Sequence, residues 1–391
     1  MISVSPCLRG DYVSRLEVAA CLAILVGGVY GTSLGPALTV LADDFDVSLD
    51  TAGLLITVLF LGSILASGAM AVWLHRFDSG LLTGTGLLLV AFGTAGIALA
   101  PAWEAALASV ALSGLGGGLM DAGSHTIVAG VSPDVTRGIN RLNVCFAFGA
   151  VAGPLWSGSV LAVDDGAREF VYLGIAVLAA GVSAFVLSTR STTAIPHSDE
   201  APTAHAITVG MDSLAWVMGA LLFLYVGAEF GLGSWVASYA DEEFDAGTFV
   251  GGLITAGYWG ALMAGRMISG ALFARGVPAT TVLKGSIGLG LIASAGIALA
   301  NDAFAIAVGA AFLTGLAFGP VWPSAMAIAA QGRSRTAPSA LVTIGNSGGF
   351  VFPWLQGRLL VSSGATTGIA LSAVLCAAML TIAVRAPRRA R

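Results

Sequence analysis

The sequence predicts an all-α membrane protein with twelve transmembrane helices in two pseudo-symmetric six-helix halves. Three observations lead to this class. Of the 391 residues, 57% are hydrophobic and only 10% are charged, whereas an ordinary soluble domain carries about 25% charged residues. Twelve apolar runs are long enough to cross a bilayer. Two blocks of sequence also recur farther along the chain, which indicates an internal duplication.

The expected helices follow from the length of the apolar runs, since a spanning helix needs about 20 mostly apolar residues. A longer break rich in Ser, Thr, Pro and Ala predicts a flexible linker at 188–209, between an N-terminal half (1–187) and a C-terminal half (210–391). The twelve runs are 16–41, 51–74, 80–100, 103–131, 139–163, 170–188, 211–240, 247–274, 279–300, 303–330, 338–362 and 365–385.

The connections alternate in charge, and this alternation predicts the orientation. Lys and Arg mark the cytoplasmic side of a membrane protein, so we expect a multi-pass protein of the cytoplasmic membrane with both termini in the cytoplasm. The bases on one side are Arg9, Arg15, Arg76, Arg137, Arg141, Arg190, Arg275, Lys284, Arg333, Arg335, Arg385, Arg388, Arg389 and Arg391. The acids on the other side, which surround Arg168, are Asp43, Asp44, Asp46, Asp164, Asp165, Asp241, Glu242, Glu243 and Asp245.

The internal duplication has an offset of about 200 residues. "ALSGLGGGLMDAGSHTIVAG" (111–130) aligns with "FLTGLAFGPVWPSAMAIAAQ" (312–331), and "GAVAGPLWSG" (149–158) aligns with "GGFVFPWLQG" (348–357). Parallel repeats of this kind place the substrate site at the interface of the halves, near the bilayer midplane. Prolines inside the runs predict helix interruptions and bending points. These are Pro36, Pro154, Pro320, Pro323 and Pro353.

Glu229 lies in the middle of the run 211–240, within "YVGAEFGLGSW" (225–235). A carboxylate at bilayer depth costs roughly 2.5–3.5 kcal/mol and marks a pathway or a proton site by default. We therefore expect Glu229 to face a central cavity, where it either exchanges a proton or stays ionised and accepts hydrogen bonds from solute hydroxyls. The alternative is a structural acid that is hydrogen-bonded to a neighbouring helix.

Asp121 is a second acid inside a span, and His125 follows it by four residues, so both lie on one face of the helix 103–131. The two side chains form either a proton relay or a simple ion pair. A histidine this close to a helix end is alternatively a satisfied interfacial residue.

Three amides lie inside the predicted spans, where amide groups must find hydrogen-bond partners. Asn140 and Asn143 are three residues apart on one face of 139–163, and Asn346 lies deeper in 338–362. Solute hydroxyls or a neighbouring helix are the expected partners.

Aromatic rings accompany the polar residues of the C-terminal half. Tyr225 shares a helix face with Glu229, and Trp235 and Trp322 lie in the runs 211–240 and 303–330. Sugars present apolar faces that stack on such rings. Core packing is the alternative for each ring, and Trp235 is alternatively an anchor in an interfacial aromatic belt.

Three stretches together resemble the major facilitator superfamily, in particular the sugar-transporting branch that includes the fucose:proton symporter. They are "GLMDAGSHTIVAGVSPDVTRGINRLNVCFAFGAVAGP", "YVGAEFGLGSW" and "LAFGPVWPSAMA" with "IGNSGGFVFPWLQG". The resemblance implies a transport role for Asp121, which matches the branch's acid on its fourth helix. The chain departs from the branch at several points, among them His125 where an Asn is usual, Asn143 where a His is common, and the absence of an acid within 24–41 of the first apolar run.

The expected function is secondary active transport of a small polar solute, a sugar or related metabolite, by alternating access, with a proton or sodium ion as the coupling ion. A multidrug or metabolite efflux antiporter of the same fold is the main alternative, and a membrane receptor that binds without flux is another. The chain is expected to be a monomer in the lipid bilayer, with no enzymatic activity, no cofactor, no metal and no nucleic-acid partner. The sequence holds no catalytic triad, His-rich cluster or phosphate-binding loop.

Overall fold

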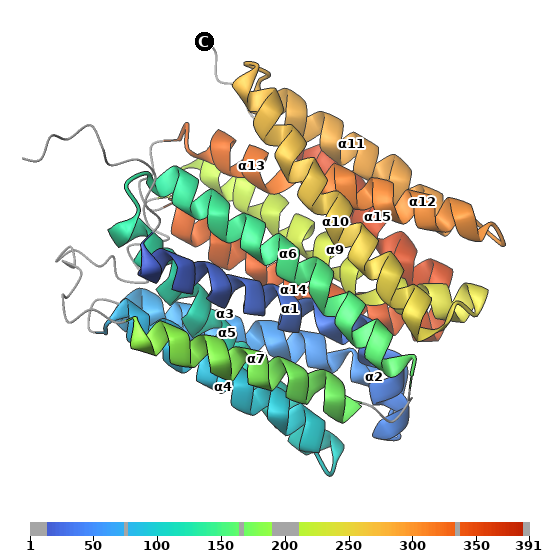
Figure 1. Ribbon diagram of the computed structural model, residues 1–391. Coiled ribbons are helices and arrows are strands. Elements are labelled where there is room, and N and C mark those ends of the chain that lie inside the picture. Colours follow the sequence, from blue (N-terminus) through green and yellow to red (C-terminus); the bar gives the residue numbers. More distant parts are fainter. Residues whose placement is uncertain (1–13, 74–76, 164–167, 190–210, 333–336, 386–391) are drawn as a thin grey trace, which may run out of the picture.

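Figure 1 shows the computed structural model of the chain, which describes residues 14–73, 77–163, 168–189, 211–332 and 337–385. Every regular element in these ranges is a helix. The bounds are α1 (Arg15–Asp44), α2 (Leu49–Ala52), α3 (Leu54–Trp73), α4 (Ser79–Leu99), α5 (Trp103–Val131), α6 (Val135–Leu161), α7 (Arg168–Ser188), α9 (Ser213–Phe244), α10 (Gly247–Ala274), α11 (Ala279–Ala298), α12 (Phe304–Phe318), α13 (Val321–Ala329), α14 (Ala337–Ser363) and α15 (Ala365–Arg385).

Several predicted features fall outside the described residues. The linker expected at 188–209 does so except for its first two residues. The others are Arg9, Arg76, Asp164, Asp165, Arg190, Arg333, Arg335, Arg388, Arg389 and Arg391.

The predicted spans are present as helices. Within the described ranges, ten segments are long and apolar enough to cross a membrane, and α12 with α13 counts as one of them. The helices α10 and α14, of 28 and 27 residues, correspond to the other two predicted spans. The all-α class and the twelve-helix architecture are thus confirmed.

Only one of the predicted proline interruptions separates two helices. Pro320 lies with Gly319 at the break between α12 and α13, where the missing proline N–H ends the hydrogen-bond ladder. In contrast, Pro36, Pro154, Pro323 and Pro353 lie inside helices, so their predicted interruptions are wrong.

A neighbouring helix explains why α6 continues through its proline. Pro154 removes the N–H that would bond to the Ala150 carbonyl, four residues earlier. The Thr32 hydroxyl of α1 lies 3.2 Å from that oxygen and shares its proton between it and the Gly28 carbonyl of its own helix, 2.9 Å away. This is the compensation from neighbouring helices that membrane-spanning segments require.

Polar residues at the starts of four helices set where they begin, because a side-chain oxygen satisfies one of the otherwise unpaired N–H groups of the first turn. Ser14 caps α1 in this way by accepting from the Glu17 N–H at 3.1 Å. The other three caps are Asp78 for α4, Asp134 for α6 and Asp212 for α9.

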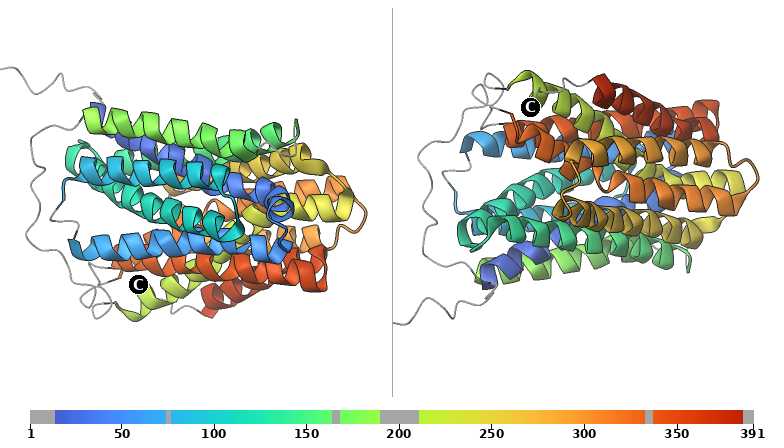
Figure 2. Two further views of the ribbon diagram at one scale, coloured as in Figure 1. Left: turned by 90° about the horizontal axis from the view of Figure 1, so that it is seen from below. Right: turned by 90° about the horizontal axis from the view of Figure 1, so that it is seen from above.

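The described helices form two bundles that lie side by side (Figure 2). In the first half, α4 packs on α5 and α7, and α1 packs on α6. In the second half, α9 packs on α14 and α15, and α11 packs on α12 and α15. We call the end where α1 begins and α15 ends the proximal end, and the opposite end the distal end.

The two halves approach closely where glycines remove side chains from the contact. A Cβ atom built on Gly252 of α10 would lie 2.9 Å from the Cα atom of Gly158 in α6. A Cβ atom on Gly35 of α1 would lie 3.1 Å from the carbonyl oxygen of Gly233 in α9. Small residues at these positions let the backbones pack directly against each other.

Charged and aromatic side chains also join the two halves near the distal end. We call these two contacts, together with the glycine contacts above, the distal seam. Arg358 of α14 donates to Asp50 of α2 at 2.7 Å. The ring of Phe60 in α3 meets that of Phe230 in α9 edge-on, with centroids 4.8 Å apart. The apolar core of the second half also takes in first-half residues near the seam: Leu38, Ala42, Ala52, Ile56 and Ala150.

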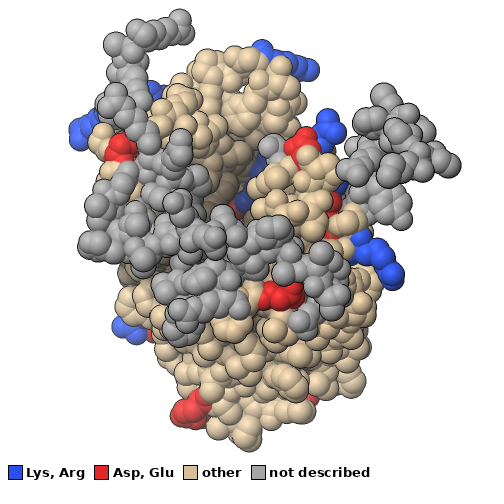
Figure 3. Space-filling view, turned by 90° about the vertical axis from the view of Figure 1, so that its left-hand side faces the viewer, with Lys and Arg blue, Asp and Glu red and all other residues tan. Residues whose placement is uncertain are grey.

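The two ends differ in charge. Figure 3 looks onto the proximal end and shows a hollow among the described helices, with basic side chains around the face. From the directions of the helices, the described bases at or near this end are Arg15, Arg137, Arg141, Arg275, Lys284 and Arg385. Among the described residues near the distal end, Arg168 and Arg358 are the bases, and the second of these is missing from the sequence-based count.

Candidate functional site

Glu229 of α9 forms a buried ion pair with Arg266 of α10. The Arg266 Nη2 atom lies 3.1 Å from the Glu229 Oε1 atom. The glutamate side chain is only 4% exposed and the arginine side chain is 25% exposed. The Tyr258 hydroxyl donates to the Glu229 carbonyl at 2.9 Å, which ties α10 to α9 beside the pair. Glu229 is therefore enclosed in this conformation, and Arg266 is its more accessible partner.

Aromatic rings from α12 and α13 close the space around Tyr225, one turn before Glu229. The Tyr225 ring centroid lies 5.9 Å from that of Phe318 and 6.4 Å from that of Trp322. Its buried hydroxyl lies beside the side chains of Glu229 and Arg266 but makes no hydrogen bond of normal geometry with a described residue. The structure thus brings the candidates Tyr225, Glu229 and Trp322 into one cluster of the second half.

Arg266 is the functional candidate that the sequence analysis missed. Its signal is present, because an arginine inside the apolar run 247–274 is as unusual at that depth as a glutamate. Two opposite charges in neighbouring spans are candidates for a pair, since a buried charge needs a partner to offset its desolvation. The pairing itself depends on how α9 and α10 face each other.

Asp121 and His125 lie together on α5 in the first half, on one face as predicted. The His125 Nδ1 atom is 3.5 Å from the Asp121 Oδ1 atom and 3.0 Å from the Asp121 carbonyl oxygen. Their side chains are 52% and 42% exposed, respectively. This pair is local and open, and it makes no described contact with the Glu229 cluster.

The three candidate amides have no hydrogen-bond partner among the described residues. Asn140 and Asn143 are exposed on α6, and Asn346 is partly buried on α14. None of them makes a side-chain hydrogen bond within the described part of the chain, so the expected bond from α6 to a neighbouring helix is not found there. Their amide groups remain open to other partners.

Other buried polar groups of the second half also have no hydrogen-bond partner within the described part of the chain. Both amide atoms of Gln356 in α14 are unpaired, although the residue is fully buried, and the Trp259 Nε1–H of α10 is unpaired as well. Such groups are expensive to leave unsatisfied. Gln356 has no signal in the sequence, because one glutamine in an apolar run carries no periodicity.

Trp235 is a structural residue of the second half. It is fully buried, and its Nε1–H donates to the Pro353 carbonyl of α14 at 2.7 Å. An aromatic-belt anchor would lie at the lipid–water interface, so that alternative is wrong.

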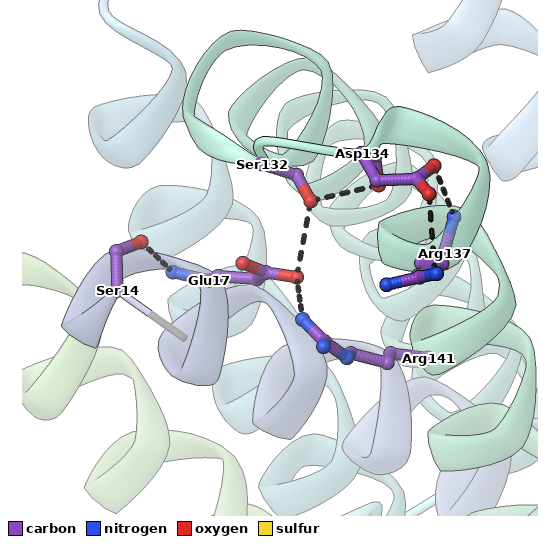
Figure 4. Close-up of polar contacts among 6 residues, drawn as sticks. All are labelled: Ser14, Glu17, Ser132, Asp134, Arg137 and Arg141. Atoms are coloured by element: carbon purple, nitrogen blue, oxygen red, sulfur yellow. Dashed lines mark hydrogen bonds and ion pairs between the residues drawn. The ribbon is translucent and has the colours of Figure 1, made fainter. Parts of the chain in front are cut away.

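A separate polar network lies at the proximal end of the first half (Figure 4). Arg141 of α6 donates to the buried Glu17 of α1 at 2.9 Å. The Ser132 hydroxyl approaches the same carboxylate oxygen at 3.5 Å, and Arg137 pairs with Asp134 in the first turn of α6. The network joins the start of α1 to the start of α6 and lies apart from the Glu229 cluster. No group of three metal-ligating side chains occurs among the described residues.

Comparisons with known proteins agree with this architecture. The family model of the Major Facilitator Superfamily matches residues 19–353. No curated protein matches the chain. Among solved structures, the chain is similar to the E. coli fucose:proton symporter, with 15% identity, a TM-score of 0.68, and 95% of this chain and 98% of that chain covered.

Two further solved structures are similar over nearly their full length. The xylose transporter from E. coli, in a partially occluded inward-open conformation, matches with 12% identity, a TM-score of 0.74, and coverage of 97% of this chain and 99% of that one. The nucleoside transporter NupG matches with 12% identity, a TM-score of 0.73, and coverage of 95% and 96%. At these identities the likeness establishes the fold alone.

Proposed function

We propose a specific transport function for this chain, which belongs to the Major Facilitator Superfamily and is therefore a multi-pass membrane transporter, not an enzyme. The proposed function is secondary active transport of a small polar solute, a sugar or related metabolite, by alternating access. The coupling ion is a proton that Glu229 takes up and releases. The protein works as a monomer in the cytoplasmic membrane, with the proximal end and both termini in the cytoplasm.

The observation that carries the proposal is the asymmetry between the two ends. The distal seam holds the halves together through Gly158, Gly252 and the Asp50–Arg358 pair. The candidate polar residues lie on the proximal side of this seam, and Asp121 and Asn143 are exposed there. A solute site with access from one side at a time needs this arrangement, closed at one end and polar toward the other.

The orientation is supported by the charge of the ends, since bases gather on the cytoplasmic side of membrane proteins. It places the described bases of the proximal end in the cytoplasm and the acidic connections outside. The conformation is then the one that faces the cytoplasm.

Proton coupling is tested with the full chain reconstituted in vesicles, by adding candidate sugars outside and following internal and external pH. Symport predicts that a transported sugar makes the external medium more alkaline. In Glu229→Gln, solute-driven proton movement is lost while the protein stays folded. Glu242→Gln, an exposed glutamate on the same helix, is the matched control and keeps the parent's coupling.

Unaltered uphill uptake in Glu229→Gln would reduce this residue to a structural acid. A response to lipophilic cations and to no sugar would instead favour an efflux antiporter of the same fold. Binding of solute without any flux would favour a receptor.

A further inference from the structure

Arg266 has more hydrogen-bond donors than its surroundings use. A guanidinium carries five N–H donors, and in this chain the one described side-chain bond runs from Nη2 to Glu229. The Nε atom is buried and has no partner among the residues that the structure describes. The Nη1 atom likewise makes no hydrogen bond within the described residues. A quarter of the side chain is nevertheless exposed, so an acceptor from outside the protein can reach it.

The neighbours of Arg266 offer no second acid. The titratable groups that act on it are Glu229 and Tyr225 from α9 and Tyr258 from its own helix, and the Tyr225 hydroxyl, a neutral group, lies beside the guanidinium. The helices α12 and α13 contribute the rings of Phe318 and Trp322 to the same cluster. Within the described part of the chain, Glu229 is thus the one carboxylate beside the guanidinium, and the remaining donors have no anionic partner.

From these donors we infer that the transported solute carries an anionic group, a carboxylate in the simplest case, which Arg266 binds through the N–H groups that Glu229 leaves free. The planar fork of an arginine matches the two oxygens of a carboxylate. This inference rests on the proposed transport function and narrows its substrate class to sugar acids and related hydroxycarboxylates.

The unpaired amides suit the rest of such a solute. Asn143 and Asn346 have no partner among the described residues, and the ring of Trp322 is partly accessible. Amides bind the hydroxyl groups of a solute, and an aromatic ring packs on its C–H face. A hydroxylated acid therefore finds both kinds of contact on the same side of the seam.

Solute binding and proton uptake are then linked through charge. Two ionised carboxylates cannot share one guanidinium at low dielectric without a large repulsion. When the solute carboxylate takes over Arg266, Glu229 accepts one proton from the aqueous medium. The anion and the proton enter together, and the net charge of the site does not change.

The test measures binding by calorimetry to the purified full chain, with two acids and their neutral counterparts as probes. Glucuronate is compared with glucose, and galacturonate with galactose, because each pair differs in a carboxylate at one carbon. We expect at least one acid to bind roughly tenfold or more tightly than its neutral partner, the typical scale of a charge-assisted hydrogen bond. Equal binding within both pairs, or no binding of either acid, would overturn the inference.

Two substitutions with opposite effects on the affinity for the acid test whether Arg266 binds it. Arg266→Lys keeps the charge that Glu229 needs for folding but loses the fork, so the affinity for the acid falls roughly tenfold. Glu229→Gln removes the competing carboxylate, so that affinity rises. Arg275→Lys, an exposed position one residue beyond α10, leaves it unchanged. Unchanged affinity in Arg266→Lys would overturn the inference.

A flux measurement distinguishes a failure of the anionic-substrate inference from a failure of the proposed transport function. Vesicles that take up protons with neutral sugars but not with the acids would contradict the anionic substrate and leave symport standing. Acid binding that depends on Arg266 but produces no flux would contradict transport and leave the anion site standing.

Discussion

The two halves each contain an acid paired with a base inside a helix bundle, yet the pairs are built differently. In the first half, Asp121 and His125 lie one turn apart on the same helix, and about half of each side chain is exposed. In the second half, Glu229 and Arg266 come from two helices, and the acid is almost fully buried. The first pair depends on helix geometry alone, whereas the second exists only when α9 and α10 are packed.

This difference indicates which pair contributes to folding stability and which pair water and solute can reach. A buried charge that loses its partner is strongly destabilising, while an exposed pair contributes little. We therefore expect loss of Arg266, which leaves the buried Glu229 unpaired, to impair folding more than loss of Glu229, whose partner is a quarter exposed. The first-half pair should be accessible to water and solute at little structural cost.

The largest expected effect is on the second-half pair. Arg266→Gln leaves Glu229 buried without a counter-charge, and we expect the free energy of unfolding in detergent to fall by about 3–5 kcal/mol. The double variant Glu229→Gln with Arg266→Gln removes both charges and should recover most of this loss. A single variant as stable as the parent would show that Glu229 is already neutral in the folded protein.

An intermediate effect is expected where the first half has a buried acid of its own. Glu17 is fully buried, and Arg141→Gln removes its ionic partner while leaving the Ser132 hydroxyl at 3.5 Å. We expect a loss of about 1–3 kcal/mol, measured by thermal unfolding of the purified protein. Arg137→Gln, whose pair with Asp134 is exposed, serves as the control and should shift the transition less. A loss as large as that of Arg266→Gln would remove the contrast between the halves.

The smallest effect is expected at the open pair. Asp121→Asn should change the free energy of unfolding by less than about 1 kcal/mol, because both side chains of the pair are close to half exposed. The same unfolding assay measures it, with His125→Gln as the companion variant. A loss comparable to that of Arg266→Gln would mean that Asp121 has a buried partner in another conformation.

Much of the fold is predictable from the sequence because it depends on local properties. The apolar runs locate the helices within a few residues, and the spacing of Asp121 and His125 predicts their shared face. The main errors arise where a distant residue decides the outcome. Pro154 does not interrupt α6, since Thr32 of another helix satisfies the carbonyl that the proline leaves free.

The candidate site is less predictable for the same reason. Glu229 stands out at once as a carboxylate in an apolar run, but its partner Arg266 is 37 residues away and becomes a partner only through tertiary packing. Gln356 gives no signal in the sequence, and its importance is visible only in its complete burial without hydrogen bonds. The roles of Asp121, Asn140, Asn143 and Asn346 in transport stay predictions.

The meeting of Gly158 and Gly252 has a consequence for motion. Interlocked side chains would have to disengage, rotamer by rotamer, before one bundle could turn against the other. The contact between these two glycines has no interdigitated side chains, so one bundle can rotate against the other about this point. An alanine at either position would add a methyl group to this contact and slow the rotation between the two states.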